Sequence, residues 1–224
     1  MKLIKPYYEI LTPINGEEIL KTIEKVARTC YKSENKITND SAHKLVQTLV
    51  LREHEAMIEF FDITVKFVCD RGVSHEIVRH RLASYAQEST RYCNYSKDKF
   101  DNQITFIIPE WCSNIKEDTI KSRVDVERLI IPEDERRWLI AMAYAEHSYN
   151  LLIEQEWQAQ QARSVLPNSL KTEINCKMNL REWRHFFRMR TSLAAHPQMR
   201  ELTIPLLKEL QEKIPIIFDG IKII

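Results

Sequence analysis

Residues 61–67 read FDITVKF, and this segment decides the fold class. Apolar side chains occupy every second position along it, and polar side chains occupy the positions between them. A period of two residues is typical of a β-strand with one face in a core and the other in solvent. Residues 170–178 alternate in the same way, and residues 104–109, ITFIIP, predict a further short strand. The sequence therefore predicts a sheet.

Segments with helical periodicity surround these strands. Asn15 and Glu18 form a capping-box-like pair ahead of an apolar stripe at helical spacing. Further helices are expected to begin near Asp40–Ser41, at Ser74 after a turn at Gly72, and at Pro132. Another is expected to end near Leu166. Asn179 with Glu182 is expected to cap the next helix, and Pro197 to begin a last one that Pro205 interrupts. These elements predict an α+β fold, with helices packed on a mostly antiparallel sheet. The lack of an obvious linker predicts a single domain over residues 1–224.

Charge and cysteine usage narrow the function classes. The chain has 33 basic and 32 acidic side chains, whereas general nucleic-acid binders carry a clear basic excess. Its five cysteines are scattered without a CxxC pair, which disfavours a disulfide scaffold or zinc knuckle and favours a reducing cytoplasm. No segment reads as a signal peptide or a membrane span. We therefore expect a cytoplasmic protein with no nucleic-acid partner and no membrane partner.

The glycine count excludes two kinds of phosphate site. The chain contains only 3 glycines, Gly16, Gly72 and Gly220, and they are far apart. A dinucleotide fingerprint needs three glycines within six residues, and a phosphate loop needs two followed by lysine. Phosphates would have to be bound by side chains and helix N-termini instead.

The predicted helix with the sequence NLREWRHFFRMR places an arginine on its apolar side. At about 100° per residue, Trp183, Phe187 and Arg190 fall within about 60° of one another. A buried guanidinium needs a partner, so Arg190 is expected to meet either a carboxylate in a salt bridge or a ligand anion. The opposite side carries polar side chains that are solvated, or that reach a phosphate or a neighbouring subunit: Arg181, Arg184, His185 and Arg188.

The segment HEIVRH at residues 75–80 resembles a zinc-protease helix only superficially. The second histidine of that motif would have to stand at Arg79. His75 and His80 are five residues apart and point in different directions from a helix, so they cannot share a metal from one face. We therefore expect no metal site.

Residues 79–92, RHRLASYAQESTRY, concentrate donors and charges between hydrophobic flanks. Arg79, His80 and Arg81 leave a short helix, and Ser89 and Arg91 follow after a bend. Forked guanidinium groups suit phosphate recognition, so the spacing favours a nucleotide or cofactor pocket. Ser84 and Ser89 lack the neighbouring base expected of a nucleophile. Cys93 is close to Arg91, which would favour its thiolate, but we expect a buried, inert thiol there.

The pattern RHR, followed after seven intervening residues by S-x-R, resembles the signature of the flavin-dependent thymidylate synthases. The residues concerned are Arg79, His80, Arg81, Ser84, Ser89 and Arg91. Three further segments agree with that family: His54 with Glu59, ARSVLP at residues 162–167, and Asn179, Arg181 and Arg190 followed by AAHPQMRE. Together they cover most of the chain from about His54 to Arg200.

The resemblance implies the flavin-dependent thymidylate synthase fold and a homotetramer with FAD sites between subunits. Such enzymes make dTMP from dUMP, with methylenetetrahydrofolate as carbon donor and NADPH or NADH as reductant of the flavin. It implies cofactor contacts from His54, Arg79, His80, Arg81, Gln87, Asn179, Leu180, Arg181 and His185. It implies dUMP contacts from Glu76, Arg79, Gln87, Glu88, Ser89, Thr90, Arg91, Arg163 and Arg190. Arg190 and Ser89 are the expected catalytic residues, Arg190 by favouring ionisation at the uracil N3.

Three positions depart from the family pattern. Gln87 stands where glutamate is frequent, Ala56 stands where a flavin-contacting hydroxyl is common, and His185 stands where asparagine also occurs. One alternative is a nucleic-acid-binding module that uses the two arginine-rich segments as basic patches. Another is a flavin protein that keeps the fold and has lost synthase activity, for which Gln87 is the hint.

Overall fold

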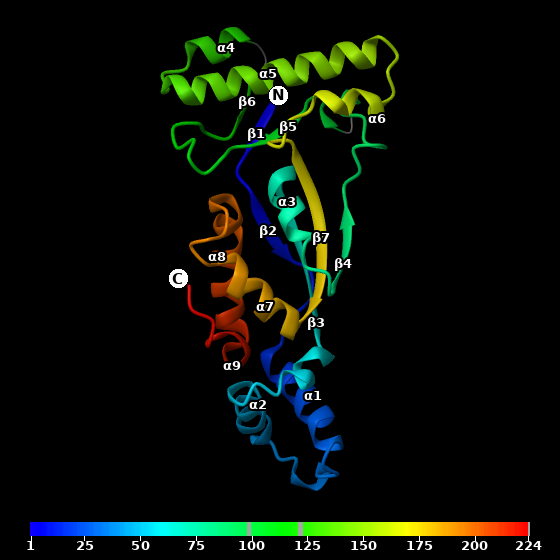
Figure 1. Cartoon of the computed structure of the whole chain (residues 1–224), viewed down its shortest axis with the longest axis vertical. Helices are drawn as coiled ribbons and strands as arrows, with labels where there is room; N and C mark the ends of the chain where they lie inside the picture. The colour runs from blue at the N-terminus through cyan, green and yellow to red at the C-terminus, as the bar shows by residue number, and fades with distance from the viewer. Residues whose placement is uncertain (98–99, 121–122, 224) are drawn as a thin grey trace. The chain divides into compact units, whose positions relative to one another are not determined.

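The computed structural model describes residues 1–97, 100–120 and 123–223 (Figure 1). The strands are β1 Lys2–Ile4, β2 Tyr7–Ile10, β3 Asp62–Asp70, β4 Ala83–Gln87, β5 Thr105–Ile107, β6 Asp118–Thr119 and β7 Lys171–Asn179. The α-helices are α1 Gly16–Thr29, α2 Ser41–Leu51, α3 Arg71–Ile77, α4 Arg123–Arg128, α5 Glu133–Glu154, α6 Ala159–Ala162, α7 Leu180–Arg190, α8 Pro197–Lys213 and α9 Pro215–Phe218. Short 3-10 helices cover Glu34–Lys36, Glu55–Phe60 and Arg163–Val165.

The strands form two sheets. One has four strands in the order β2–β3–β7–β4, and the other has three in the order β5–β1–β6. In the smaller sheet β1 runs antiparallel to β6 but parallel to β5, with Leu3 opposite Phe106. The predicted α+β class with mostly antiparallel sheets is confirmed. The parallel pair was not predicted, because the sequence signal of β1 is only three residues long.

The chain divides into two compact units, and each unit collects several segments. Unit 1 contains Met1–Tyr7, Phe67–Arg79 and Ala86–Ile174, and unit 2 contains Tyr8–Lys66, His80–Tyr85 and Asn175–Ile224. Each of β3, β4 and β7 continues from one unit into the other. The single domain over residues 1–224 stays a prediction.

The core of unit 1 gathers around the smaller sheet and α5. Phe106 of β5 and Leu3 of β1 are fully buried, and Leu139 and Tyr149 of α5 pack in the same cluster. The amino group of Met1 forms an ion pair of 2.8 Å with Glu146 of α5. Unit 1 therefore rests on contacts between the N-terminus and a helix far along the sequence.

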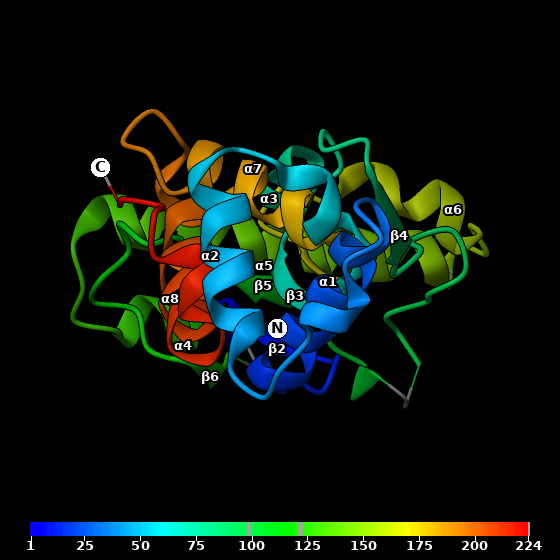
Figure 2. The ribbon, with the colours of Figure 1, turned by 90° about the horizontal axis from the view of Figure 1, so that it is seen from below.

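The core of unit 2 is built on α7, whose aromatic side chains pack together. The rings of Trp183 and Phe187 stack with centroids 5.6 Å apart, and Phe187 meets Phe218 of α9 edge to face at 5.8 Å. Helices α1 and α2 pack against each other in the same unit (Figures 1 and 2). Position 16, the first residue of α1, requires glycine because a β-carbon there would lie 2.5 Å from the carbonyl oxygen of Lys213.

Most of the local predictions agree with the structure. Asn15 caps α1 by accepting from the amide of Glu18 at 3.3 Å, α5 begins after Pro132, and β3 buries Ile63 and Val65 on one face. The 104–109 segment contains β5, and the 170–178 segment contains all of β7 except its last residue, Asn179. The helix expected to end near Leu166 corresponds to α6 with the 3-10 turn Arg163–Val165.

Two local predictions were wrong. Helix α3 begins at Arg71 rather than at Ser74, because Asp70 accepts from the amide of Val73 at 2.6 Å and caps the helix earlier, so Gly72 lies inside it. Pro205 does not interrupt α8. An internal proline costs a helix about 3 kcal/mol, and the burial of apolar side chains around it, such as those of Leu206 and Leu210, offsets that cost.

Among the described residues, none of the helices combines the length and the apolar character that a membrane crossing requires.

Candidate active site

Helix α7 positions most of the predicted cofactor-contacting residues of unit 2. The side chain of Asn179 accepts from the amide of Glu182 at 2.9 Å and caps the helix where β7 ends. The amide of Leu180 donates to Phe61 and the indole of Trp183 donates to Ile63, both at 3.0 Å. Backbone acceptors at the start of β3 therefore hold α7 in place. The cap at Asn179 and Glu182 was predicted, and it is confirmed.

A group of polar side chains in unit 2 surrounds His80, and we call it the His80 cluster: His80, Tyr85, Glu182, His185 and Arg190. The imidazole is buried. Its Nδ1 lies 3.2 Å from a carboxylate oxygen of Glu182, and its Nε2 accepts from Nε of Arg190 at 3.0 Å. The phenol of Tyr85 donates to the backbone carbonyl of His80 at 2.6 Å. The ring of His185 lies edge-on to that of His80, with centroids 5.7 Å apart.

The electrostatics of this cluster keep His80 neutral. Burial, followed by the positive charges of Arg190 and His185, lowers the pKa of His80 to about 4. Burial raises the pKa of Glu182, against the opposing effects of His185 and Arg181. The predicted apolar-side position of Arg190 is confirmed only in part, since Arg190 is half-buried, and one of its partners is the imidazole of His80.

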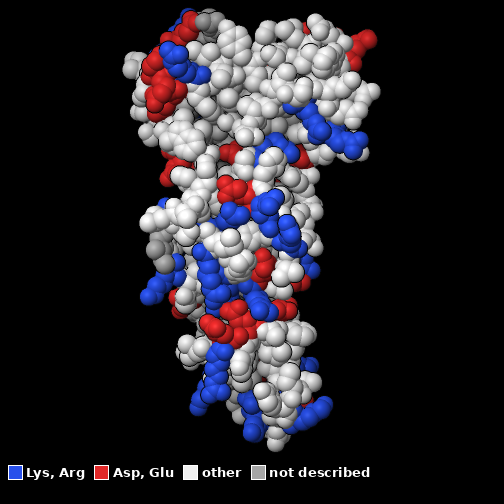
Figure 3. Space-filling model, viewed as in Figure 1, with Lys and Arg blue, Asp and Glu red and all other residues white. Residues whose placement is uncertain are grey.

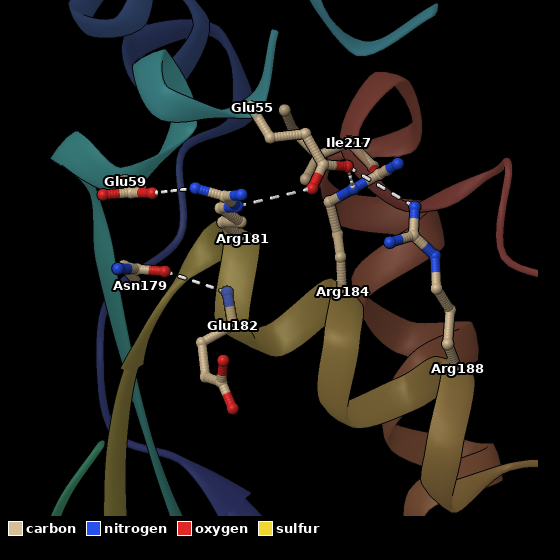
Figure 4. Close-up of polar contacts among 8 residues, drawn as sticks. All are labelled: Glu55, Glu59, Asn179, Arg181, Glu182, Arg184, Arg188 and Ile217. Atoms are coloured by element: carbon tan, nitrogen blue, oxygen red, sulfur yellow. Dashed lines mark hydrogen bonds and ion pairs between the residues drawn. The ribbon is translucent and has the colours of Figure 1, made fainter. Parts of the chain in front are cut away.

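The other side of α7 carries a second charged group, the Glu55 cluster: Glu55, Glu59, Arg181, Arg184 and Arg188 (Figure 4). Arg184 donates to Glu55 at 2.8 Å and to the backbone carbonyl of Ile217. Arg188 reaches the same carboxylate at 3.4 Å, and Arg181 binds Glu59 at 2.6 Å. The carboxylate of Glu182 points away from these arginines in Figure 4.

Arg184 is the buried arginine of α7, which the sequence did not single out. It is 4% exposed, and burial lowers its pKa against the opposing effect of Glu55. The 3-10 helix Glu55–Phe60 and α9 pack against this side of α7 and exclude water from it. The side chains on this side of α7 were predicted to be solvated, or to reach a phosphate or a neighbouring subunit. Arg181, His185 and Arg188 are exposed to solvent, whereas Arg184 is buried, so solvation is wrong for Arg184.

Three potential metal ligands lie close together in the described part of the chain. The ligand atoms of His80, Glu182 and His185 all lie within 4.8 Å of one another. This group was not predicted, because its members are far apart in the sequence and do not coincide with the HEIVRH segment. The guanidinium of Arg190 bonds to His80, and a fixed positive charge at that distance opposes a cation.

In unit 1 the predicted dUMP segment follows strand β4. The amide nitrogen of Gln87 donates to Ser74 at 2.9 Å and to Thr172 at 3.2 Å, so its side chain is held against α3 and β7. The guanidinium of Arg163 donates to the hydroxyl of Thr90 at 2.9 Å. The structure thus brings together two predicted nucleotide contacts that are far apart in sequence.

Glu88 belongs to a third group, the Lys171 cluster: Glu88, Tyr95, Lys171 and Glu173. Lys171 lies 3.0 Å from Glu88 and 2.5 Å from Glu173, and Tyr95 donates to Glu88 at 3.0 Å. Burial lowers the pKa of Lys171, but its bonds to the two carboxylates outweigh that effect and raise it. All four residues line a cavity of about 270 Å³. The carboxylate of Glu88 is therefore engaged within unit 1.

The remaining predicted residues of the 76–91 segment differ in exposure. Arg79, Arg81 and Arg91 are exposed, whereas Glu76 and Ser89 are half-buried. The hydroxyl of Ser89 accepts from the amide of Arg91 at 3.3 Å, and the guanidinium of Arg91 lies over the ring of Tyr92 at 5.4 Å. Strand β4 was not predicted. Its five residues alternate in burial, but they lie within the segment 79–92, which was expected to form a pocket.

His54 lies at a cavity of about 620 Å³ in unit 2. Its walls combine apolar side chains with cations: Ala27, Arg28, Cys30, Tyr31, Ser33, Lys36, Leu45, Leu49, His54, Ala56 and Met57. Leu180, in contrast, is fully buried, and its amide donates to the carbonyl of Phe61 at 3.0 Å.

Basic and acidic side chains interleave over much of the face that Figure 3 shows. This distribution agrees with the formal net charge of +1 and gives no support to an extended nucleic-acid surface on that face.

Several residues with a clear place in these clusters were missed. Glu182 was noticed only as part of a helix cap, and Glu55, Tyr85 and Lys171 carried no sequence signal. One signal was available for Glu182: it stands four residues before Phe186 and eight before Arg190, on the same side of a helix.

Comparisons with known proteins agree over most of the chain. A family model described as thymidylate synthase complementing protein matches residues 14–216. The flavin-dependent thymidylate synthase of Pyrococcus furiosus is 31% identical over 183 residues, which cover 81% of this chain and 68% of that protein. The enzyme of Pyrococcus abyssi is 31% identical over 87% of this chain and 75% of its own length. That of Corynebacterium aurimucosum is 30% identical over 90% of this chain and 79% of its own length.

A solved structure shares the fold. The crystal structure of a UMP/dUMP methylase, PolB from Streptomyces cacaoi, bound with 5-Br dUMP, aligns with a TM-score of 0.74 at 19% sequence identity. The alignment covers 98% of this chain and 96% of that one. The family model and the relatives together show that the chain belongs to the flavin-dependent thymidylate synthase family.

Proposed function

We propose that this chain is a flavin-dependent thymidylate synthase. It methylates dUMP to dTMP, takes the carbon from methylenetetrahydrofolate and uses NADPH or NADH as reductant through FAD. The observation that carries the proposal is the family match over residues 14–216, which includes the RHR and S-x-R positions of this chain. The solved relative is titled a UMP/dUMP methylase, which supports a uridine nucleotide as substrate.

The side chains of unit 2 fit the chemistry of FAD. A flavin needs apolar and aromatic contacts for its rings and cations or amides for its pyrophosphate. Around the 620 Å³ cavity, the apolar walls can contact the flavin rings, and Arg28, Lys36 and His54 can bind the pyrophosphate. Arg181 and His185 add exposed donors. When bound, FAD supplies the hydride that completes the methyl group.

The proposed FAD contacts are those of the family resemblance, with two refinements. Leu180 is fully buried and contributes by holding the start of α7 against Phe61, and the side-chain oxygen of Asn179 is already used by the cap of α7, which leaves its amide nitrogen to donate. The proposed set is His54, Arg79, His80, Arg81, Gln87, Asn179, Leu180, Arg181 and His185.

The proposed nucleotide contacts are Glu76, Arg79, the segment Gln87–Arg91, Arg163 and Arg190. Arg163 and Arg91 supply forked donors that suit a phosphate. Ser89 positions the nucleotide through its hydroxyl. Arg190 stabilises negative charge that develops on the uracil ring, and such stabilisation is a large catalytic effect when it is preorganised. The carboxylate of Glu88 is held by Lys171 and Tyr95, so Glu88 acts on dUMP by fixing the loop or through its backbone.

We further propose that the active enzyme is a homotetramer in the cytoplasm. The family resemblance supports the tetramer, and the scattered cysteines support the reducing compartment.

The test is an assay of the purified, FAD-loaded protein. NADPH oxidation is followed with and without dUMP, and products are identified after methylenetetrahydrofolate is added. A parallel reaction replaces dUMP by UMP. Oxidation stimulated by dUMP, with dTMP as product, is the expected result.

Two results would contradict the proposal. A flavin-bound protein that oxidises NADPH but forms no dTMP has lost synthase activity, as Gln87 allows. A colourless protein without a response to dUMP, but with salt-sensitive DNA binding, belongs to the nucleic-acid class. Methylation of UMP in preference to dUMP would keep the reaction type and change the substrate.

A further inference from the structure

The two ring nitrogens of His80 have different partners, and these partners fix where its proton lies. Nε of Arg190 always carries a hydrogen, so Nε2 of His80 at 3.0 Å must be the acceptor. The carboxylate of Glu182 is an acceptor when ionised, so Nδ1 at 3.2 Å carries the hydrogen. The chain of donors runs from Arg190 to His80 to Glu182.

The surroundings of His80 hold this arrangement. The ring is 5% exposed and lies edge-on to Phe186 with centroids 4.8 Å apart, while Tyr85 binds the backbone carbonyl of His80 at 2.6 Å. The low pKa of His80, about 4, keeps one ring nitrogen unprotonated at neutral pH, as an acceptor must be.

The position of Glu182 on α7 serves the same geometry. Glu182, Phe186 and Arg190 follow one another at intervals of four residues, so one side of the helix carries the carboxylate, the ring contact and the guanidinium. Figure 4 shows the Glu182 carboxylate directed away from the arginines of the Glu55 cluster. Its backbone is fixed by the Asn179 cap.

We propose that Glu182 is a positioning residue: it fixes the Nδ1–H tautomer of His80, and His80 in turn orients the guanidinium of Arg190. A guanidinium is planar and rigid, so a bond at Nε sets the plane of its two terminal nitrogens. The consequence for catalysis rests on the proposed function, in which Arg190 acts on the uracil ring. The tautomer itself does not depend on that function.

The direct measurement is the tautomer of His80 by 15N NMR of the imidazole nitrogens, in flavin-free and FAD-loaded protein. The wild-type protein is expected to show a protonated Nδ1 and an unprotonated Nε2. Glu182→Leu removes the acceptor and should convert His80 to a mixture or to the Nε2–H tautomer. Glu182→Gln keeps a neutral acceptor and should keep the Nδ1–H tautomer.

Activity supplies the second readout. With the bond from Arg190 to His80 lost or weakened, Glu182→Leu should lower kcat for dTMP formation about tenfold, the size expected for one lost hydrogen bond to a charged group. Glu182→Gln should recover most of that loss. The matched control is Glu17→Gln, which removes a carboxylate 2.7 Å from the exposed His43 and should change neither the His80 tautomer nor kcat.

The outcomes separate the positioning role from the proposed function. A protonated Nε2 in the wild type overturns the inference, and this result requires no variant to fold. If Glu182→Leu changes neither the tautomer of His80 nor kcat, the positioning role of Glu182 is also overturned. In that case dTMP formation by the wild type still supports the proposed function. Saturable zinc binding that shifts the His80 and His185 signals would show that these groups form a metal site instead. Absence of dTMP formation in the wild type refutes the function, and the tautomer measurement still decides the hydrogen-bond chain.

Discussion

The two sides of helix α7 carry similar residue types and use them differently. On one side Arg181, Arg184 and Arg188 share the carboxylates of Glu55 and Glu59. On the other side a single arginine, Arg190, is joined to a neutral imidazole. On the first side the guanidinium groups bond to carboxylates, and on the second the Nε–H of Arg190 bonds to an uncharged ring.

Under the proposed function, the difference lets one helix combine a structural task with a catalytic one. A buried guanidinium bonded to a carboxylate is neutralised, so it stabilises the fold but cannot stabilise a ligand anion strongly. A bond from Nε to an uncharged imidazole orients a guanidinium without adding negative charge beside it, which suits electrostatic catalysis. Substitutions on the two sides of α7, and the titration of His80, test this contrast.

The largest effect is expected for Arg190→Ala. This change removes the charge proposed to act on the uracil ring and should lower kcat for dTMP formation by at least about 10²-fold, as loss of a preorganised donor does. The flavin should remain bound, and its visible absorbance measures that directly. Arg190→Lys keeps the charge but loses the fork, so it should recover only part of the activity. Near-normal turnover in Arg190→Ala would remove Arg190 from the mechanism.

On the opposite side, Arg184→Ala should act on stability. Arg184 is 4% exposed and bonds both to Glu55 and to the carbonyl of Ile217, so its removal leaves buried acceptors without their donor. We expect the free energy of unfolding to fall by about 3 kcal/mol. Denaturant unfolding of the flavin-free protein measures it, and a loss below about 1 kcal/mol, typical of an exposed pair, would show that the Glu55 cluster is not a buried ion-pair site.

The neutral state of His80 predicts a pH dependence. The pKa of this histidine is lowered to about 4 in the folded protein, in surroundings that include Glu182, His185 and Arg190. Between about pH 6.5 and pH 4 the unfolded chain binds a proton that the folded protein does not, so stability falls as the pH is lowered through this window. The loss attributable to His80 should reach up to about 3 kcal/mol near pH 4. It is measured as the difference in unfolding free energy between the wild type and His80→Gln at each pH, and a difference that stays constant across the window would contradict it.

The smallest effect is expected for Arg188→Ala. Its side chain is 49% exposed and reaches Glu55 at 3.4 Å, a long and solvated contact. The free energy of unfolding should change by less than about 1 kcal/mol, since exposed ion pairs contribute little. The same unfolding experiment compares it with Arg184→Ala. Equal losses in the two variants would mean that burial does not distinguish the two arginines.

Sequence patterns alone predict the α+β class, the strands β3, β5 and β7 and the caps at Asn15 and Asn179. These features depend on alternation, helical spacing and side-chain to backbone bonds within a few residues, which are local properties. The RHR and S-x-R positions also placed the chain in its family, because a family signature is a property of residue order. The predicted site residues themselves stay predictions.

The pairing of the charged groups depends on tertiary packing. Helical spacing placed Arg184 on a polar side, but the segment Glu55–Phe60 and α9 cover that side and bury it. Spacing likewise placed Arg190 on an apolar side, but the sequence could not supply its partner, since His80 lies 110 positions earlier in the chain. Burial and charge pairing depend on what packs from distant parts of the chain, so no local pattern contains them.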